Sequence, residues 1–141
     1  MLIVPYKPEH LHTLNIQASQ ALFGPLLHDA EYGEMLLTAG PAFSGIIENE
    51  TIISAGIINQ WHNRGVAWAL VSEKAGKNFV AIHKAISRFL DMNDTKRVET
   101  YVDDGFEQGF RWMKMLGFEY EGRMRAYSPD GRDCLLYARV K

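Results

Sequence analysis

The spacing of hydrophobic residues near the C-terminus predicts a helix that turns into a strand. Apolar side chains recur three or four positions apart, as on one face of a helix: Phe106, Phe110, Met113 and Leu116. Gly117 follows, and glycine adopts at the lowest cost the left-handed conformation that ends many helices. From Tyr120 to Ala126, apolar or small residues alternate with charged ones, which is typical of a half-buried strand.

The first forty residues predict one strand and two helices. Residues 2–4 form a short apolar run that suits a strand. Pro8 is tolerated in a first helical turn, and we expect a helix from there to about Gln20. Its buried face would carry Leu11, Leu14 and Ala18. Residues 24–25, Gly-Pro, interrupt the pattern before a second helix over Ala30–Thr38.

The middle of the chain predicts three consecutive strands. Residues 42–48 and 51–60 flank the polar residues 49–50, a short connection that suits a hairpin. Gly56, inside the second of these strands, indicates a bulge or a close approach of another backbone. After a longer polar turn, residues 66–72 form an apolar strand of the kind that is buried on both faces.

A helix and a further strand follow. The helix carries one apolar face: Phe79, Ile82, Ile86, Phe89 and Leu90. Residues 97–102 form the strand, with Glu99 and Tyr101 on the face opposite Val98. Because strand–helix–strand crossovers of this length are right-handed, we expect this strand to run parallel to residues 66–72.

The chain closes with a hairpin. Residues 128–131, Ser-Pro-Asp-Gly, predict a turn before a last strand at residues 133–140. Farther back, Asp103 and Asp104 follow the strand of residues 97–102, where they either attract an amine or cap the next helix. We favour capping, because aspartate is preferred at a helix start on both hydrogen-bond and dipole grounds.

Composition limits the classes of function. A chain of 141 residues, 47% of them hydrophobic, suits a single domain over residues 1–141. The formal charge of -2 argues against a nucleic acid as the main partner. The lone Cys134 fits a reducing compartment, and no leader or long apolar run stands out, so we expect a soluble cytoplasmic protein with no membrane partner. The five histidines lack ligand spacing, so no metal is expected.

Residues 116–122 carry the closest likeness to a known family. Their letters, Leu-Gly-Phe-Glu-Tyr-Glu-Gly, resemble the end of the C-terminal motif N-x-x-A-x-x-L-Y-E-K-L-G-F of the GCN5-related N-acetyltransferases, the GNAT superfamily. In that alignment Gly109 stands at the alanine and Trp112 at the leucine. Phe106 replaces the asparagine, and Met113 replaces a tyrosine that often serves the family as general acid. A thioether cannot donate a proton.

The resemblance implies a fold and an activity. The fold is of the α/β (α+β) class, the GNAT-like acyl-CoA N-acyltransferase fold. It has a mixed, mostly antiparallel central sheet of about seven strands, with about four helices and with parallel strands four and five splayed apart. The implied activity is transfer of an acetyl group from acetyl-CoA to an amine of a small molecule or a protein. The acyl-pantetheine arm would insert between the splayed strands.

The same resemblance assigns residues to acetyl-CoA. Leu70, Val71 and Ser72 would offer backbone groups to the pantetheine arm. The pyrophosphate would lie at the following helix start, on Lys74, Ala75, Gly76, Lys77 and Asn78. Free N–H groups, the helix dipole and two lysines can hold such an anion. The family signature R/Q-x-x-G-x-G/A puts Glu73 at the arginine and Asn78 at the last small residue, so a solvated helix start without a ligand is the alternative.

Two residues of the strand at 97–102 are candidates for proton transfer. Acyl transfer from a thioester needs a deprotonated amine, a polarised carbonyl and a proton for the departing sulfur. Glu99 is the candidate base, directly or through water, and a salt-bridged or solvated strand glutamate is the alternative. Tyr101 or water would return the proton.

A narrower likeness concerns phage proteins. Residues 67–78, 97–102 and 110–133 also resemble a group of short GNAT-like proteins encoded by tailed phages, whose activity is generally unassigned. Two hypotheses follow: a CoA-dependent N-acyltransferase, or a catalytically degenerate GNAT fold that acts in virion assembly or host-protein binding. In the second case the protein would be found in the virion or in the host cytoplasm. The amine substrate and the oligomeric state, a homodimer included, stay open.

Overall fold

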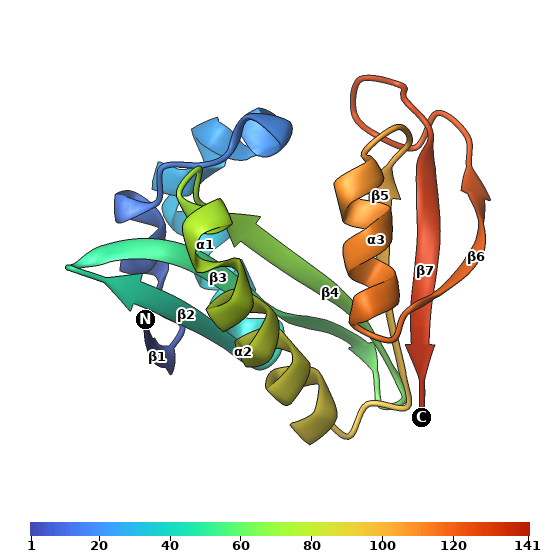
Figure 1. Cartoon of the computed structure of the whole chain (residues 1–141), viewed down its shortest axis with the longest axis horizontal. Coiled ribbons are helices and arrows are strands. Elements are labelled where there is room, and N and C mark those ends of the chain that lie inside the picture. The colour runs from blue at the N-terminus through green and yellow to red at the C-terminus, as the bar shows by residue number, and fades with distance from the viewer. The chain divides into compact units, whose positions relative to one another are not determined.

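The computed structural model describes residues 1–141, and its strands form one seven-stranded sheet (Figure 1). The strands are β1 (Leu2–Pro5), β2 (Ala42–Ile47), β3 (Glu50–Trp61), β4 (Arg64–Val71), β5 (Arg97–Asp103), β6 (Glu119–Met124) and β7 (Cys134–Val140). Their order is β1-β2-β3-β4-β5-β7-β6. The pair β4 and β5 is parallel, whereas β1 with β2, β2 with β3, β5 with β7 and β6 with β7 are antiparallel. The predicted mixed, mostly antiparallel sheet is therefore confirmed.

The helix predicted over Ala30–Thr38 is confirmed, and short 3-10 helices accompany the α-helices. The α-helices are α1 (Ala30–Thr38), α2 (Phe79–Met92) and α3 (Glu107–Met115), and the 3-10 helices are η1 (Pro8–Thr13), η2 (Ala18–His28) and η3 (Ala75–Asn78). The chain divides into two compact units, residues 1–59 with 68–93 and residues 60–67 with 94–141. Both units contain parts of β3 and β4, and a single domain over the whole chain stays a prediction.

The prediction of one helix from Pro8 to about Gln20 is wrong. Two 3-10 helices, η1 and η2, take its place, and residues 14–17 between them are not helical. The reason is a contact with β4: Ile16 forms an antiparallel bridge with Ser72, and the Gln17 N–H donates to the Val71 carbonyl over 2.9 Å. Backbone groups used in this way are lost to a helix. Leu11 and Leu14 are buried as predicted, but Ala18 is exposed.

Two further details of the first unit differ from the expectation. η2 continues through the Gly-Pro of residues 24–25, where the helical pattern was expected to be interrupted. The turn between β2 and β3 consists of Glu48 and Asn49, with φ of 50° and 64°, one residue earlier than predicted. Positive φ at both central residues is the requirement of the hairpin turn that matches strand twist, met here without glycine.

The glycine inside β3 marks a close backbone approach, one of its two predicted meanings. A Cβ on Gly56 would lie 2.6 Å from the Ala42 Cβ and 2.7 Å from the Pro41 carbonyl oxygen. The bulge of this strand pair lies elsewhere, between Gly45 and Ile46. Only a glycine therefore lets residues 41 and 42 approach β3 at this point.

The core of the first unit lies on both sides of its strands. One cluster of buried side chains joins the N-terminal segments to β4: Tyr6, Leu11, Leu14, Leu27, Leu36 and Leu70. On α2, Ile82, Ile86 and Leu90 are buried as predicted. The Phe43 ring of β2 lies 5.2 Å from the Phe89 ring of α2. β4 was expected to be buried on both faces, but Val66–Ala69 are only half-buried and full burial is reached at Leu70 and Val71.

In the second unit, β7 lies between β5 and β6, and α3 covers the face of β5 that carries Val102 (Figure 1). Gly117 ends α3 with φ of +85°, which confirms the predicted left-handed residue. In β6 the predicted alternation holds for Gly122 and Met124, which are half-buried, but Tyr120 is 56% exposed because β6 forms the edge of the sheet.

The favoured role of the two aspartates as helix caps is wrong. The N-cap residue of α3 is Phe106, and no side chain caps this helix. Asp103 instead accepts a hydrogen bond from Arg132 over 2.9 Å, and Asp104 accepts one from Arg123 over 2.6 Å. Arginine partners on the closing hairpin, far along the chain, thus compete successfully with the nearby helix start.

Candidate functional site

The carboxyl end of β4 and the start of α2 form the first candidate region. Alternate residues of a strand present their backbone N–H and C=O groups to opposite edges. The Ser72 N–H donates to the Ile52 carbonyl of β3 over 2.8 Å, so Ser72 and Leu70 face β3. Ala69 and Val71 therefore direct their polar groups to the other edge of β4. This is the edge at which an extended ligand would find hydrogen-bond partners.

That edge is occupied by two glutamines from the N-terminal part of the same unit. The Gln20 Nε2 donates to the Ala69 carbonyl over 2.7 Å, and the Gln20 Oε1 accepts from the Val71 N–H over 2.9 Å. The Gln17 N–H donates to the Val71 carbonyl over 2.9 Å. Both polar backbone groups of Val71 are thus satisfied, and the side chains of Leu70 and Val71 are buried.

The loop after β4 is built by local hydrogen bonds. The buried Ser72 hydroxyl accepts from the Lys74 N–H over 3.1 Å, and the Ser72 carbonyl accepts from the Ala75 N–H over 3.0 Å. The Asn78 side chain donates to the Lys74 carbonyl over 3.2 Å, and no side chain caps α2. A Cβ on Gly76 would meet nothing within 4 Å, so the loop is open around this residue.

The two lysines of this loop have different surroundings. The Lys74 Nζ lies 2.7 Å from a Glu50 oxygen, and the Asn15 side chain donates to the other Glu50 oxygen over 2.9 Å. The hydrogen bond from Lys74 lowers the pKa of the Glu50 carboxyl. Lys77 is exposed. Of the two predicted phosphate ligands, Lys77 is therefore the more available, because Lys74 would have to leave a carboxylate.

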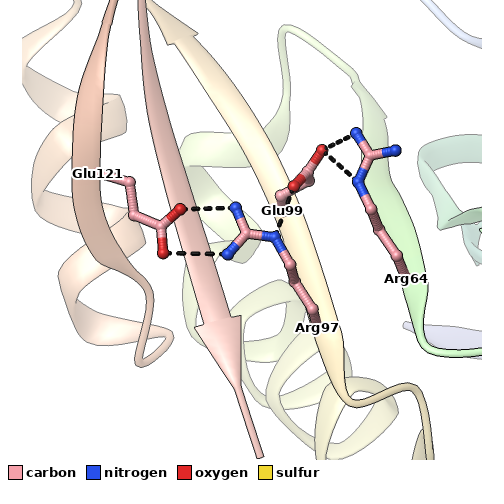
Figure 2. A network of polar contacts seen from close by, with 4 residues as sticks. All are labelled: Arg64, Arg97, Glu99 and Glu121. Atoms are coloured by element: carbon pink, nitrogen blue, oxygen red, sulfur yellow. Dashed lines mark hydrogen bonds and ion pairs between the residues drawn. The ribbon is translucent and has the colours of Figure 1, made fainter.

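In the second unit, Glu99 lies at the centre of an ion-pair network that crosses the sheet (Figure 2). Its carboxylate accepts from the Nε and the terminal nitrogen of Arg64, and from the Arg97 Nε over 2.7 Å. The guanidinium of Arg97 also contacts both oxygens of Glu121, over 2.6 and 3.0 Å. Arg64 in turn lies 4.8 Å from the ring centre of Trp61, in a cation–π contact.

This network changes how Glu99 behaves as an acid or base. The residue is only 7% exposed, and the hydrogen bonds from Arg64 lower the pKa of its carboxyl. A carboxylate with a lowered pKa is a weaker base than a free one. The structure therefore places Glu99 in the salt-bridged alternative that the sequence left open.

Tyr101 is more accessible than Glu99. It is 47% exposed, and its ring meets the Tyr127 ring edge-on with 5.0 Å between the centres. Partial burial raises the pKa of the Tyr101 phenol, and the neighbouring Tyr127 raises it further. The phenol thus stays protonated at neutral pH and retains a proton to donate.

Two departures from the family motif are packed against each other in α3. A Cβ on Gly109 would lie 2.7 Å from the Phe106 ring and 2.6 Å from the Val102 Cγ1. The Phe106 ring and the Val102 side chain together leave no room for a side chain at the motif's alanine position. Met113 is half-buried at the position of the motif's tyrosine. The contact between residues 106 and 109 suggests the hypothesis that the two departures from the motif are coupled, which the alignment alone does not indicate.

The sequence did not identify Gln17 and Gln20, nor Arg64 and Glu121 as partners in the network. The residue types of the glutamines gave no signal, because a glutamine in a polar segment is most often solvated. For the network, Arg97 and Glu99 stand two apart and therefore share a strand face. That spacing was a usable signal for one ion pair, but the partners on other strands depend on register.

The structure contains neither a cluster of metal-binding side chains nor a helix suited to cross a membrane. No group of three or more His, Cys, Asp or Glu side chains is placed to hold a metal ion. None of the helices combines the length and the apolar composition that crossing a membrane requires.

Comparison with known proteins gives the fold. No protein-family model matches the chain, and no curated protein matches it. Among solved structures, a GNAT-family acetyltransferase from Streptococcus pneumoniae has 15% identity and a TM-score of 0.74, and the match covers 99% of this chain and 98% of that one. Aminoglycoside 6'-acetyltransferase type Ii has 14% identity and a TM-score of 0.72, with coverage of 99% and 97%.

A third structure, a mutant of the spermidine N-acetyltransferase from Vibrio cholerae, has 14% identity and a TM-score of 0.68. That match covers 99% of this chain and 95% of the other. At such identities the likeness establishes the fold and nothing finer. The chain has the GNAT acyl-CoA N-acyltransferase fold, as the motif at residues 116–122 predicted.

Proposed function

We propose that this protein is a CoA-dependent N-acyltransferase that moves an acetyl group from acetyl-CoA to an amine of a small molecule or a protein. The observation that carries the proposal is the junction of β4 and α2. There the edge of β4 that carries Ala69 and Val71 is followed by the short 3-10 helix η3, which is open around Gly76 and leads into α2 without a side-chain cap. The shared fold with solved N-acetyltransferases supports the same activity.

The start of α2 suits a pyrophosphate. N–H groups at a helix start have no partner within the helix, and the helix dipole favours an anion there. The space around Gly76 admits a ligand close to the backbone, and the exposed Lys77 supplies a positive charge. Ala75 and Asn78 complete this loop, and Lys74 joins it if its ion pair with Glu50 opens.

The edge of β4 that carries Val71 suits the two amides of a pantetheine arm, on the condition that its present contacts open. Val71 offers an N–H and a C=O on this edge, the donor and acceptor that an extended amide chain uses. Both groups are engaged by Gln17 and Gln20, so these contacts must open before a ligand can take their place.

Bound there, acetyl-CoA supplies a thioester that is already reactive. The acceptor amine attacks the carbonyl carbon, the carbon–sulfur bond breaks with its electron pair on sulfur, and the proton lost by the amine is returned to that sulfur. By the family resemblance, Tyr101 or water would return this proton, and the raised pKa of Tyr101 keeps its phenol protonated. Glu99 stays a candidate base only if a water molecule relays the proton, since Arg64 and Arg97 hold its carboxylate.

A second candidate is favoured by one observation, the occupied edge of β4. If Gln17 and Gln20 never leave Val71, the fold would serve binding without turnover, as in a virion-assembly or host-interaction protein. The likeness to short phage proteins belongs to this alternative. The two candidates differ in whether acetyl-CoA binds at all.

Calorimetric titration of ligand-free protein with acetyl-CoA tests the proposal. We expect micromolar affinity, about -8 kcal/mol, weakened by Lys77→Ala. The matched control is Lys84→Ala, because Lys84 is also an exposed lysine but lies within α2, away from η3 and the helix start. No heat at millimolar acetyl-CoA, with either the natural chain or a chain lacking the Gln20 side chain, would refute the acyltransferase and favour the second candidate.

A further inference from the structure

The contact on β4 extends beyond the Gln20 side chain and the Gln17 backbone. The Glu73 N–H donates to the Asn15 carbonyl over 2.8 Å, and Ile16 bridges with Ser72. Residues 15–20, which we call the strap, therefore lie along β4 and its following loop from Ala69 to Glu73. The strap forms hydrogen bonds of the kind that an added strand would form.

The Gln20 side chain, at the end of the strap, carries a carboxamide that resembles the amides of a pantetheine arm. The Gln20 carboxamide donates one hydrogen bond to Ala69 and accepts one from Val71. A pantetheine arm contains two secondary amides, each with one donor and one acceptor. The strap and the arm therefore compete for the same backbone groups with the same chemistry.

We propose that Gln20 is an affinity-determining residue for acetyl-CoA, because the pantetheine amides must displace its carboxamide from Ala69 and Val71. This inference rests on the proposed function. Exchange of one neutral amide for another keeps the number of hydrogen bonds constant, so the displacement is close to balanced in free energy. The apparent affinity for acetyl-CoA equals the intrinsic affinity multiplied by the fraction of molecules in which Gln20 has left β4.

The part of the strap that carries Gln17 and Gln20 is only partly buried. Gln17 and Gln20 are half-buried, whereas Ala18 and Ser19 are exposed. The backbone of Gln20 departs from helical geometry, with φ of -114° and ψ of 16°, and no side chain caps η2. Release of the Val71 groups thus requires a new rotamer of Gln20 and the loss of the bond from the Gln17 N–H.

The competition is selective for the pantetheine part of the ligand. Adenosine 5′-diphosphate carries a pyrophosphate for the start of α2 but no amide for β4. Its affinity should not depend on Gln20, while the affinity of acetyl-CoA should. Two ligands therefore separate an effect on the β4 edge from a general effect on the fold.

The experiment is calorimetric titration of the full chain with acetyl-CoA and with adenosine 5′-diphosphate. The variants are Gln20→Ala and Gln20→Glu, which keeps the size of the side chain but cannot donate to Ala69. Ser19→Ala is the control, because Ser19 is an exposed neighbour in the strap. We expect Gln20→Ala to tighten acetyl-CoA about tenfold, since net hydrogen bonds are worth roughly that factor. The diphosphate should bind all four proteins equally.

Amide hydrogen exchange provides a second readout that does not depend on affinity. In the natural chain, acetyl-CoA should speed the exchange of the Gln17 N–H, which loses its partner on Val71. The Val71 N–H should stay protected, because the ligand replaces Gln20 as its acceptor. The diphosphate should leave both amides unchanged.

The possible outcomes distinguish the inference about Gln20 from the proposed acyltransferase function. Tighter acetyl-CoA binding by the Gln20 variants, with faster exchange at Gln17 on binding, supports the inference. Equal acetyl-CoA affinity for the natural chain and both variants, with Gln17 still protected, overturns it and leaves the acyltransferase proposal standing. Failure of acetyl-CoA to bind any variant overturns the proposed function and the inference together.

Discussion

The two compact units hold their polar groups in different ways. In the first unit the contacts are mostly between neutral groups: the hydroxyls of Ser44 and Ser54 lie 2.7 Å apart, and Gln20 bonds the backbone of β4. In the second unit, charged side chains bridge the strands, as in the network around Glu99. Neutral hydrogen bonds can be exchanged for those of a ligand at little cost, whereas removal of one ion leaves its partner uncompensated. Adaptation to a ligand therefore belongs to the first unit.

Removal of the central carboxylate should be the most damaging change in the second unit. In Glu99→Gln, two half-buried guanidinium groups, those of Arg64 and Arg97, would lose their shared anion. We expect a loss of about 2 to 3 kcal/mol in the free energy of unfolding, below the range for fully buried pairs because both arginines are partly solvated. Urea denaturation measures this loss.

The control for that change is Glu121→Gln. Glu121 pairs with Arg97 in the same network, but its side chain is 38% exposed. An exposed ion pair contributes about 0 to 1 kcal/mol, so this variant should unfold close to the natural chain. A cost as large as that of Glu99→Gln would show that position within the network, and not burial, sets the energy.

The next largest effect on stability should come from overpacking, and it can be measured by alanine substitution at two glycines with different surroundings. In Gly109→Ala the new methyl would meet the Phe106 ring at 2.7 Å and the Val102 Cγ1 at 2.6 Å. We expect a net loss of about 1 to 2 kcal/mol, because overpacking outweighs the helix propensity that alanine gains. Gly76→Ala, at the open loop of the first unit, should be within about 0.5 kcal/mol of the natural chain.

A second variant tests whether the departures at 106 and 109 are coupled. In a Phe106→Asn background, Gly109→Ala should cost less than it does alone, because the ring is gone and only Val102 still obstructs the methyl. A double-mutant cycle from urea unfolding measures the coupling. Equal costs in both backgrounds would mean that the Phe106 ring moves aside freely.

The sequence alone predicted the elements that depend on local spacing, but not the contacts between distant residues. The end of α3 at Gly117 and the parallel pair of β4 and β5 were predicted, because both depend on local spacing and chain connectivity. The strap was not, because its partners on β4 lie about fifty residues away, and Leu11 and Leu14 fitted a helical face equally well. Distant partners also redirected Asp103 and Asp104. Local patterns specify elements, whereas register decides which polar groups meet.

The two units should also respond to acid in separate pH ranges. In the first unit the His10 Nδ1 lies 2.8 Å from the Ser44 hydroxyl and accepts from the Lys7 N–H, and burial lowers the pKa of the imidazole from 6.5. The folded state thus disfavours the charged form. The contribution of the neutral His10 side chain to stability is complete above pH 6.5 and is lost as the pH falls below that value. In the second unit the lowered pKa of Glu99 implies a loss only below pH 4.5.

Hydrogen exchange at several pH values, corrected for the intrinsic rate, measures both ranges. Amides of η1 and β2 should begin to lose protection below pH 6.5, while those of β5 and β7 keep theirs until below pH 4.5. His10→Asn is the control, because an amide oxygen can accept the same hydrogen bonds and does not titrate. Simultaneous loss in both units, or an unchanged pH range in His10→Asn, would contradict the assignment.

The smallest expected effect is that of salt, and it tests the comparison of the units most directly. Raising NaCl from 0.1 to 1 M shortens the Debye length from about 10 to about 3 Å. The exposed pairs of the second unit, Arg123 with Asp104 and Arg132 with Asp130, should weaken, and the neutral contacts of the strap should not. We expect the free energy of opening measured by hydrogen exchange to fall slightly in β6 and β7 relative to β2. An equal change in both units would mean that the surface pairs add nothing to stability, and the contrast would then rest on the Glu99 network alone.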